Sequence, residues 1–275
     1  MRDPIELYEY PREWIRRGAE KRISSGLYIL TPRGWLRRGI TTGTTASAAI
    51  VASISSLEQD VKYVSVSTPA GIDVRVRVSA KRGLARARKF SGDHAFDATD
   101  GVVFVARTIE EGGIKFGKGI AREEEHVVSH AARKQLMENY TWVCEAFGYE
   151  GGVLIEAEFR SKSERLNGIA ILGTTGFVEP WCDELLKTKI EIAKRYDRIA
   201  VTTGRDSWKT AKELFPEFQP FVFGVHLKEI LKAHDGEIVI VGKRGLLKHV
   251  FGSESRDDVL KSARELGNVL EVVVC

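Results

Sequence analysis

Residues 36–53, LRRGITTGTTASAAIVAS, place a Thr-Thr-Gly-Thr turn between a short basic segment and a run of small residues. The small side chains predict a closely packed helix over residues 44–56. The threonines can cap this helix, and the exposed N–H groups at a helix N-terminus attract anions. The turn is therefore either a binding turn for an anion or cofactor or an ordinary helix cap. The local pattern favours the cap, and no Gly-Lys-Ser/Thr follows as in a P-loop.

A second turn of the same kind occurs in ILGTTGFVEP, residues 171–180. Its Gly173-Thr174-Thr175-Gly176 loop is expected between a buried strand and a helix, a placement that suits a nucleotide-like ligand. The loop lacks the Gly-x-Gly-x-x-Gly spacing of a dinucleotide site. A binding loop and a structural turn are equally good interpretations of this segment.

Composition places the chain among soluble globular proteins. Its 275 residues are 43% hydrophobic and 29% charged, enough for two domains. No apolar run reaches the length of a membrane span, and the charged, proline-containing N-terminus differs from a signal peptide. Cys144, Cys182 and Cys275 lack metal-ligand spacing and cannot all pair with one another, which favours a reducing, cytoplasmic location.

Two further features of the composition bear on partners and source. The net charge of +4 is too small to indicate nucleic acid by itself. The few Asn, Gln, Met and Cys residues beside many charges favour a thermophilic source.

Two domains are expected. Residues 1–165 are predicted to form an α+β domain that contains the Thr-Thr-Gly-Thr turn. Its expected elements are helices over 4–23, 44–56 and 123–147, a hairpin over 61–68 and 72–79, and strands over 84–90, 102–108 and 152–160. The hairpin rests on period-2 alternation, as in Ile72, Val74, Val76 and Val78.

Residues 166–275 are predicted to form an α/β domain that contains the Gly-Thr-Thr-Gly loop. Short apolar strands alternate with helices there, which indicates βαβ units and a small, about four-stranded parallel sheet. The four strands are 168–172, 198–202, 220–223 and 237–241, and 269–274 is a fifth candidate without an assigned place. Ligands bind beyond the carboxyl ends of such strands, where we expect the loops at 173–176, 203–206 and 242–245.

Three other clusters have competing interpretations. Asp93, His94, Asp97 and Asp100 lie in one loop that can hold a cation or a ribose, although acidic loops are more often solvated turns. His126 and His130 are one helical turn apart, but no third ligand follows, so a metal site is not expected. The basic stretch contains Lys81, Arg82, Arg86, Arg88 and Lys89. It can meet phosphates or carboxylates, and a solvated edge strand protected by charge is the favoured interpretation.

Five blocks, in order along the chain, resemble the cobalt-precorrin-5B C(1)-methyltransferase (CbiD) family. Residues 36–49 look like the family's L-R-x-G-Y-T-T-G-T-C-A-A-A-A, and residues 169–180 look like I-S-I-L-G-T-T-G-I-V-x-P, the most specific block. Asp97, Thr99 and Gly101 look like D-V-T-x-G. Gly112, Gly113 and Gly117 look like a G-G-x-G-x-G loop, and residues 237–252 look like a final strand-loop block.

The chain also departs from the family pattern. Thr45 stands where the family has a cysteine, and Gly204-Arg205-Asp206-Ser207 replaces a Gly-Asn-x-Gly loop. Gly242-Lys243-Arg244-Gly245-Leu246 replaces Gly-His-x-Gly-Lys. The resemblance therefore supports the fold more firmly than the activity.

The resemblance implies transfer of a methyl group from S-adenosylmethionine to ring carbon 1 of cobalt-precorrin-5B in cobalamin synthesis. The products would be cobalt-precorrin-6A and S-adenosylhomocysteine. Cobalt would arrive inside the tetrapyrrole, so no metal ligand of the protein, nucleic acid or membrane is implied, and a homo-oligomer is left open. Because the macrocycle can supply the electron-rich carbon, the protein's main task would be to position two ligands and exclude water.

The resemblance also implies roles for individual residues. S-adenosylmethionine would contact Gly173, Thr174, Thr175, Gly176, Gly242 and Gly245. The substrate would contact Arg37, Arg38, Thr41, Gly43, Thr44, Lys243 and Arg244. Thr42, Asp97 and Thr99 are positioning candidates, and no catalytic acid or base is assigned. The alternatives are a kinase-like enzyme that uses a nucleotide and a non-catalytic corrinoid-binding protein.

Overall fold

The computed structural model describes residues 1–159 and 168–275 and contains two compact units. The parallel-sheet unit comprises Met1–Ser24, Ile29–Leu36 and Trp181–Cys275. The antiparallel-sheet unit comprises Ser25–Tyr28 and Arg37–Pro180. The predicted fold class, an α+β domain and an α/β domain with a small parallel sheet, is confirmed.

A six-stranded sheet forms the antiparallel-sheet unit, in the order β4-β5-β6-β7-β9-β8. Its strands are β4 (Val61–Ser67), β5 (Asp73–Lys81), β6 (Leu84–Arg88), β7 (Val103–Ile109), β8 (Gly113–Phe116) and β9 (Gly152–Glu158). All neighbours are antiparallel except β8 and β9. The predicted hairpin is β4 with β5, and β5 alternates between buried and exposed residues along its whole length. The alternation indicates one face toward a core and one toward solvent.

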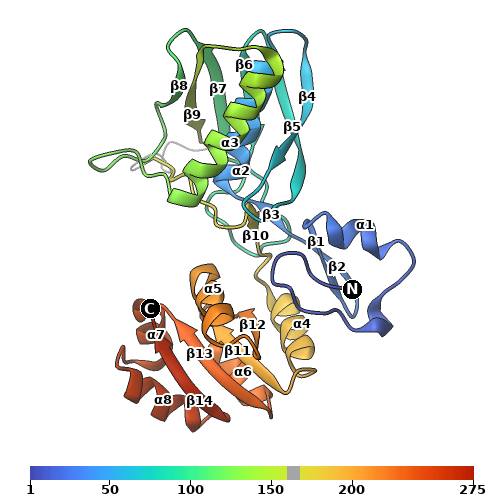
Figure 1. The fold of residues 1–275 in the computed structure, drawn as a ribbon, viewed down its shortest axis with the longest axis vertical. Coiled ribbons are helices and arrows are strands. Elements are labelled where there is room, and N and C mark those ends of the chain that lie inside the picture. The colour runs from blue at the N-terminus through green and yellow to red at the C-terminus, as the bar shows by residue number, and fades with distance from the viewer. Residues whose placement is uncertain (160–167) are drawn as a thin grey trace. The chain divides into compact units, whose positions relative to one another are not determined.

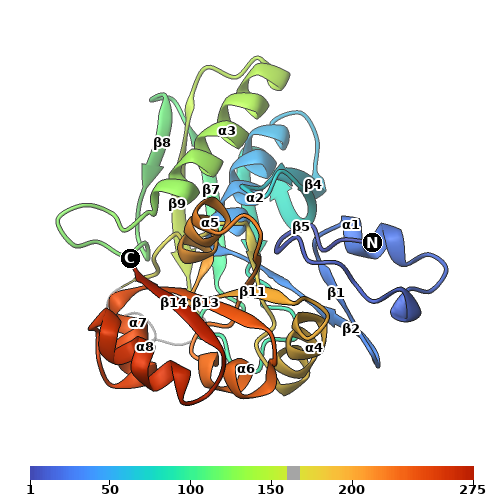
Figure 2. The same cartoon turned by 60° about the horizontal axis from the view of Figure 1, so that its bottom comes forward.

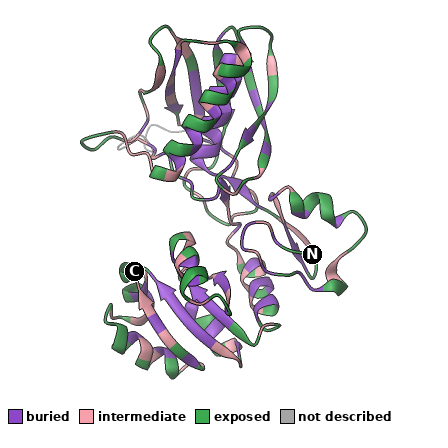
Figure 3. Cartoon of the chain, in the orientation of Figure 1, coloured by how far each residue is buried: buried purple, intermediate pink, exposed green. Residues whose placement is uncertain are grey.

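Helix α2 (Thr42–Ser55) covers the core face of this sheet and contacts β4, β5, β6, β7 and β9. Every residue of α2 from Thr42 to Ile54 is buried, as Figure 3 shows by its colour. Helix α3 (His130–Phe147) packs on α2 (Figure 1). The small side chains of α2 let the sheet and α3 approach it from different sides, which confirms the predicted helix.

The predicted start of α3 is wrong. The helix begins at His130, where the Ser129 hydroxyl caps it by accepting from the amide of Ala132 at 3.3 Å. The preceding residues are held outside the helix by other parts of the chain. Val127 donates its amide to the Ala121 carbonyl at 2.8 Å, and Val128 forms a bridge with Ile171.

A four-stranded parallel sheet forms the centre of the parallel-sheet unit, in the order β12-β11-β13-β14. Its strands are β11 (Arg198–Thr202), β12 (Gln219–Val222), β13 (Glu237–Gly242) and β14 (Val269–Val274). One hydrophobic cluster joins the sheet to α4 (Asp183–Ala193), α6 (Leu227–Ala233), α7 (Arg244–Phe251) and α8 (Arg256–Arg264). A second, smaller cluster includes Ala211 of α5 (Arg205–Leu214). Figure 2 shows α5 and the other helices on opposite sides of the sheet.

The predicted number of parallel strands is right, but one member differs. Residues 269–274 are the fourth strand, whereas residues 168–172 belong to the antiparallel-sheet unit. There they form two isolated bridges, Ile120 with Ile169 and Val128 with Ile171. Their backbone groups are thus bonded to the segment before α3, which leaves them no place in the parallel sheet.

The predicted helix over residues 4–23 is wrong for most of its length. Asp3 Oδ1 accepts the amides of Ile5 and Glu6 at 3.0 and 2.9 Å, but the chain reverses at Leu7, whose φ is +66°. Only η1 (Arg12–Trp14) and α1 (Ala19–Ser24) are helical. The segment then joins the α/β core, since Tyr8 stacks on Phe221 with 5.5 Å between ring centroids.

The predicted boundary between residues 165 and 166 lies outside the described residues. The compact units instead change between Pro180 and Trp181, and residues 1–24 are grouped with the C-terminal part of the chain. A fully buried Lys189 on α4 holds this arrangement, since it pairs with Glu6 and donates to the Val222 carbonyl at 2.9 Å. Strands β1 (Tyr28–Thr31), which contributes to the same core, and β2 (Gly34–Arg37) form a separate two-stranded sheet. Within the described ranges, no helix is long and apolar enough to cross a membrane.

Candidate functional site

The two Thr/Gly turns lie against each other in the antiparallel-sheet unit. The Thr41 amide and the Thr44 hydroxyl both donate to the Gly176 carbonyl, at 3.0 and 2.9 Å. The Gly43 amide donates to the Leu172 carbonyl at 2.9 Å. Beside these contacts, β3 (Gly39–Ile40) pairs antiparallel with β10 (Phe177–Val178). We call this contact between residues 38–44 and 170–179 the motif seam.

The helix-cap interpretation of the first turn is the one that the structure supports. The Thr41 hydroxyl accepts the amide of Thr44 at 3.2 Å, and the Gly43 amide is bonded within the motif seam. The Thr42 hydroxyl accepts from the Leu172 amide at 2.8 Å. All four residues of the turn are buried. The amides of Gly43 and Thr44 are therefore occupied by the protein itself and do not face an anion.

Arg38 is also part of the motif seam. Its side chain is fully buried, with Nε 2.7 Å from Glu179 Oε1, and its Nη1 donates to the Gly26 carbonyl at 3.2 Å. This arrangement argues against the expected contact between Arg38 and a substrate carboxylate. Arg37, the preceding residue, is exposed, and its guanidinium lies 4.1 Å from the centre of the Phe90 ring.

The glycines of the second turn allow a close approach. A Cβ on Gly173 would lie 2.5 Å from Thr41 Oγ1, and one on Gly176 would lie 2.5 Å from Thr68 Cβ. Thr175 is buried, and its hydroxyl accepts the Phe177 amide at 3.2 Å. Of the four residues in this loop only Thr174 is exposed, so it is the side chain in the loop that is free to meet a ligand.

Asp97 anchors the loop between β6 and β7. Its Oδ1 accepts the amide and hydroxyl of Thr99 at 2.8 and 2.6 Å. Its Oδ2 accepts Ser91 Oγ at 2.7 Å and the buried Lys89 Nζ at 3.0 Å. Burial acts to raise the pKa of this carboxyl, but the hydrogen bonds outweigh it and hold the pKa well below the ordinary value. Asp97 and Thr99 are thus suited to position the loop, and an already ionised, fully engaged Asp97 is a poor proton acceptor.

The other members of the acidic loop bind nearby protein groups. Asp93 Oδ2 accepts the Arg37 amide at 2.7 Å, Asp100 Oδ1 accepts the Ser91 amide at 3.1 Å, and His94 Nδ1 accepts the Phe96 amide at 3.1 Å. His126 precedes α3, so it does not share a helical face with His130. Among residues 1–159 and 168–275, no three His, Cys, Asp or Glu side chains are grouped to hold a metal ion.

Two of the three predicted glycine loops meet at the carboxyl edge of the parallel sheet. The Lys243 amide after β13 donates to Thr203 Oγ1 after β11 at 2.9 Å, and Lys243 Nζ lies 2.8 Å from Asp206 Oδ2. The hydrogen bond from Lys243 to Asp206, with the charge of that carboxylate, raises the pKa of Lys243. A Cβ on Gly242 would lie 2.8 Å from Leu247, whereas one on Gly245 would meet nothing within 4 Å. Gly242 is thus required by packing, and Gly245 is open.

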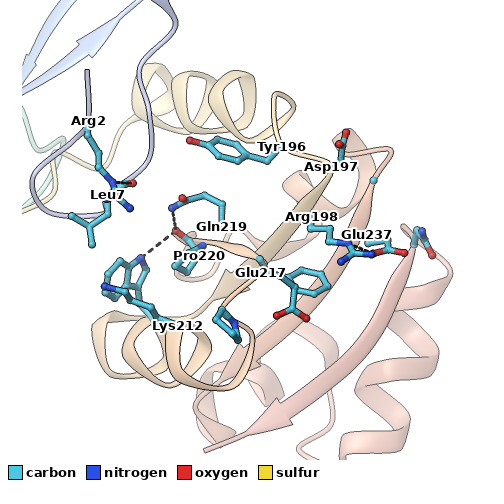
Figure 4. A pocket seen from close by; sticks show the side chains of 15 residues that line it. Arg2, Leu7, Tyr196, Asp197, Arg198, Lys212, Glu217, Gln219, Pro220 and Glu237 are labelled. Carbon is cyan, nitrogen blue, oxygen red and sulfur yellow. Dashed lines mark hydrogen bonds and ion pairs between the residues drawn. The ribbon is translucent and has the colours of Figure 1, made fainter.

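The third loop, 173–176, belongs to the antiparallel-sheet unit, so the prediction that it shares this sheet edge is wrong. A hollow of about 790 Å³ in the parallel-sheet unit lies at the opposite edge, where Arg198, Gln219 and Glu237 begin their strands (Figure 4). Arg198 and Glu237 form an ion pair there at 2.7 Å. This hollow is therefore separate from the predicted binding loops.

A second hollow, of about 710 Å³, lies in the antiparallel-sheet unit. Five arginines line it: Arg37, Arg75, Arg77, Arg86 and Arg88. We call it the arginine hollow. Sequence reasoning favoured a charged edge strand for part of this set, but β6 lies between β5 and β7, so that interpretation is wrong. The predicted basic stretch did not include Arg75 and Arg77. The alternation of arginine with valine in β5 could have indicated that these two arginines share an exposed face.

The comparisons with known proteins agree on one family. The family model described as CbiD matches residues 31–180. A protein of Archaeoglobus fulgidus named cobalt-precorrin-5B C(1)-methyltransferase is 55% identical over 96% of this chain and 92% of its own length. A protein of the same name from Methanospirillum hungatei is 36% identical over 91% of this chain and 83% of its own length.

A solved structure is similar along the whole chain. The crystal structure titled cobalamin biosynthesis protein (cbiD) from Archaeoglobus fulgidus superposes with a TM-score of 0.93 at 53% identity, covering 100% of both chains.

The motif seam predicts a strong effect of Gly176→Ala. The φ of Gly176 is +89°, and the added Cβ would lie 2.5 Å from Thr68. Backbone strain and overpacking together should lower the free energy of unfolding by about 2 kcal/mol or more. Gly112→Ala is the matched control, because its Cβ would come no closer than 3.7 Å to another atom. Urea denaturation would measure both variants, and equal stability would contradict the role of the seam.

The low pKa of Asp97 predicts how acid affects stability. The ionised carboxylate stabilises the folded chain above the unfolded-state pKa, about 3.9, and this contribution is lost as the pH falls toward the folded-state pKa. Asp97→Asn lacks the contribution. The difference in Tm between the native chain and this variant should be constant between pH 5 and 7 and should shrink below about pH 4. A difference that does not vary with pH would show that the ionised form has no such role.

Proposed function

Because this chain belongs to the CbiD family, we propose that it is an S-adenosylmethionine-dependent methyltransferase that methylates C-1 of cobalt-precorrin-5B in cobalamin synthesis. The observation that carries the proposal is the 55% identity, over 96% of the chain, to a relative of that name. The departures from the family motifs include Thr45, which is buried in α2 and donates its hydroxyl to the Thr41 carbonyl at 2.8 Å. Such a residue serves the helix and is compatible with the same reaction.

The carboxyl edge of the parallel sheet is the proposed place for the methyl donor. Lys243, Arg244 and Gly245 are exposed there, and a Cβ placed on Gly245 would meet nothing within 4 Å. These residues fit a ligand with a nucleoside and a carboxylate, since ligands bind beyond the carboxyl ends of parallel strands. The Gly173–Gly176 loop belongs to the antiparallel-sheet unit, and Thr174 is the exposed side chain through which this loop can meet a ligand, because Thr175 is buried.

The chain's residues act by binding and orientation. S-adenosylmethionine supplies an activated methyl group when it is bound. Arg37 is an exposed cation that we assign to a substrate carboxylate, and Arg38 is left to the motif seam. Asp97 and Thr99 hold their loop and move no proton, because both oxygens of Asp97 already accept hydrogen bonds. Transfer to an electron-rich carbon depends on near-attack geometry and the exclusion of water.

The cytoplasmic location belongs to the same proposal, because the reduced state expected for three unpaired cysteines suits that compartment. The thermophilic source stays a prediction from composition.

Anaerobic incubation with cobalt-precorrin-5B and S-adenosylmethionine carrying a labelled methyl group tests the reaction. We expect one labelled methyl group in the macrocycle for each molecule of S-adenosylhomocysteine formed. Mass spectrometry measures both products. Heat-denatured protein is the control. Calorimetry separates the alternatives: binding of ATP without any S-adenosyl ligand would favour a kinase-like enzyme. Binding of a corrinoid without S-adenosylmethionine would favour a carrier.

Gly245→Phe tests the donor site without disturbing the core. A side chain fits at Gly245 because nothing lies within 4 Å of its Cβ position, so the Tm should stay near that of the native chain. If the loop contacts the donor, the added ring should weaken S-adenosylhomocysteine binding at least tenfold. Lys248→Phe, on the exposed side of the same helix, is the matched control. Unchanged affinity in Gly245→Phe would remove this loop from the donor site.

A further inference from the structure

Four of the hollow's arginines project from two neighbouring strands on the face of the sheet opposite α2. In β5, Arg75 and Arg77 are exposed between the buried Val74, Val76 and Val78. In β6, Arg86 and Arg88 are exposed between buried alanines. In the antiparallel pairing of β5 with β6, Val78 lies opposite Ala87 and Ser79 lies opposite Arg86. One position further along the two strands, Arg77 and Arg88 are neighbours. The register therefore gathers the four guanidinium groups on one outer face.

Few carboxylates accompany these arginines. Among the described residues that line the hollow, the carboxylates are Asp100 and Glu158, and Glu158 pairs with Arg86 at 2.5 Å. Arg75 lies over the Tyr63 ring at 4.4 Å, and Arg88 donates to the Gly101 carbonyl at 3.2 Å. Glu158 thus neutralises Arg86, whereas the contacts of Arg75 and Arg88 orient their guanidinium groups without neutralising them.

Fold stability does not account for such a cluster. Like charges that face each other across strands destabilise a sheet. A hollow lined by one sign of charge concentrates the electrostatic field and attracts ions of the opposite sign. The cluster is thus better explained by an anionic ligand than by the packing of the sheet.

The remaining lining of the hollow is mostly apolar, with Ser79 and the buried Lys89 as its polar members. Leu27, Ile40, Phe90 and Val103 contribute to it, and its volume of about 710 Å³ is within the range of about 300–1,000 Å³ typical of small-molecule sites. Arginine binds carboxylates through two parallel hydrogen bonds. The ligand that fits this combination is a large molecule with an apolar body and several carboxylates at its edge.

We propose that the arginine hollow binds the tetrapyrrole through its acetate and propionate groups, with Arg75 and Arg77 as principal carboxylate contacts. This inference rests on the proposed function for the identity of the ligand, and it places the substrate's carboxylates on the outer face of β5 and β6. Arg37, above the Phe90 ring, lies at the edge of the same hollow. The site is contained within the antiparallel-sheet unit.

Binding of uroporphyrin, a porphyrin with eight carboxylates, tests the proposal on the full-length chain by fluorescence titration. The double variant Arg75→Gln with Arg77→Gln should bind at least tenfold more weakly than the native chain. Arg107→Gln is the matched control, because Arg107 is exposed on the same face in β7 but does not line the hollow. Its affinity should stay within twofold of native. Arg75→Lys with Arg77→Lys should fall between native and the glutamine double variant.

Several results would overturn the proposal. One is equal affinity of the native chain and the glutamine double variant when both have the same Tm. Another is absence of porphyrin binding by the native chain. A third is that inorganic tripolyphosphate binds as tightly as the porphyrin and loses affinity equally in the glutamine double variant. That result would show that the hollow binds polyanions in general and is not a tetrapyrrole site.

The methyl-transfer assay separates this proposal from the proposed function. If methylation occurs and the glutamine double variant keeps the native KM for cobalt-precorrin-5B, the proposed binding site in the arginine hollow is wrong and the proposed function is correct. If methylation does not occur but porphyrin binding depends on Arg75 and Arg77, the function fails while the binding site stands. With both correct, KM for the precorrin should rise at least tenfold with little change in KM for S-adenosylmethionine.

Discussion

An ion pair between the buried Arg38 and the partly buried Glu179 joins segments that are 141 residues apart in the chain. A buried charge is costly unless it is paired and hydrogen-bonded, so this contact fixes where the two segments meet. The β3–β10 pairing and the bonds from Thr41, Gly43 and Thr44 follow directly beside it. Helix α2 starts at this point, and α3 and the strands β4, β5, β6, β7 and β9 pack on it.

This constraint gives a structural reason for the two blocks that contain the Thr/Gly turns, residues 36–49 and 169–180. Thr42 and Thr44 of the first block bond backbone groups of the second block, and Gly43 and Gly173 leave room for the opposite turn. The sequence pattern resembles a binding turn, but most of its backbone and hydroxyl groups are hydrogen-bonded to other parts of the protein. The groups available to ligands lie beside it, at Thr174 and Arg37, and at the exposed loops of the parallel sheet.

The arrangement is consistent with chemistry that depends on position. Asp97, whose pKa is held well below its ordinary value, accepts four hydrogen bonds and serves its own loop. Positive charge is concentrated instead in the arginine hollow, where repulsion between like charges on neighbouring strands costs some stability. A polycarboxylated ring would offset that repulsion when it binds, so its affinity and the stability of the sheet are linked.

The sequence by itself determined the elements whose cause is local. Alternation along β5, the run of small residues in α2 and the βαβ pattern after Arg198 predicted the two fold classes, because burial periodicity is set by neighbouring residues. Only the tertiary structure decided that residues 168–172 leave the parallel sheet, that β6 is an inner strand and that residues 1–24 join the α/β core. It also decided that Arg38 is buried while Arg37 is exposed. Each of these depends on a partner far away in the chain, and a local pattern carries no information about which distant backbone or charge will be there.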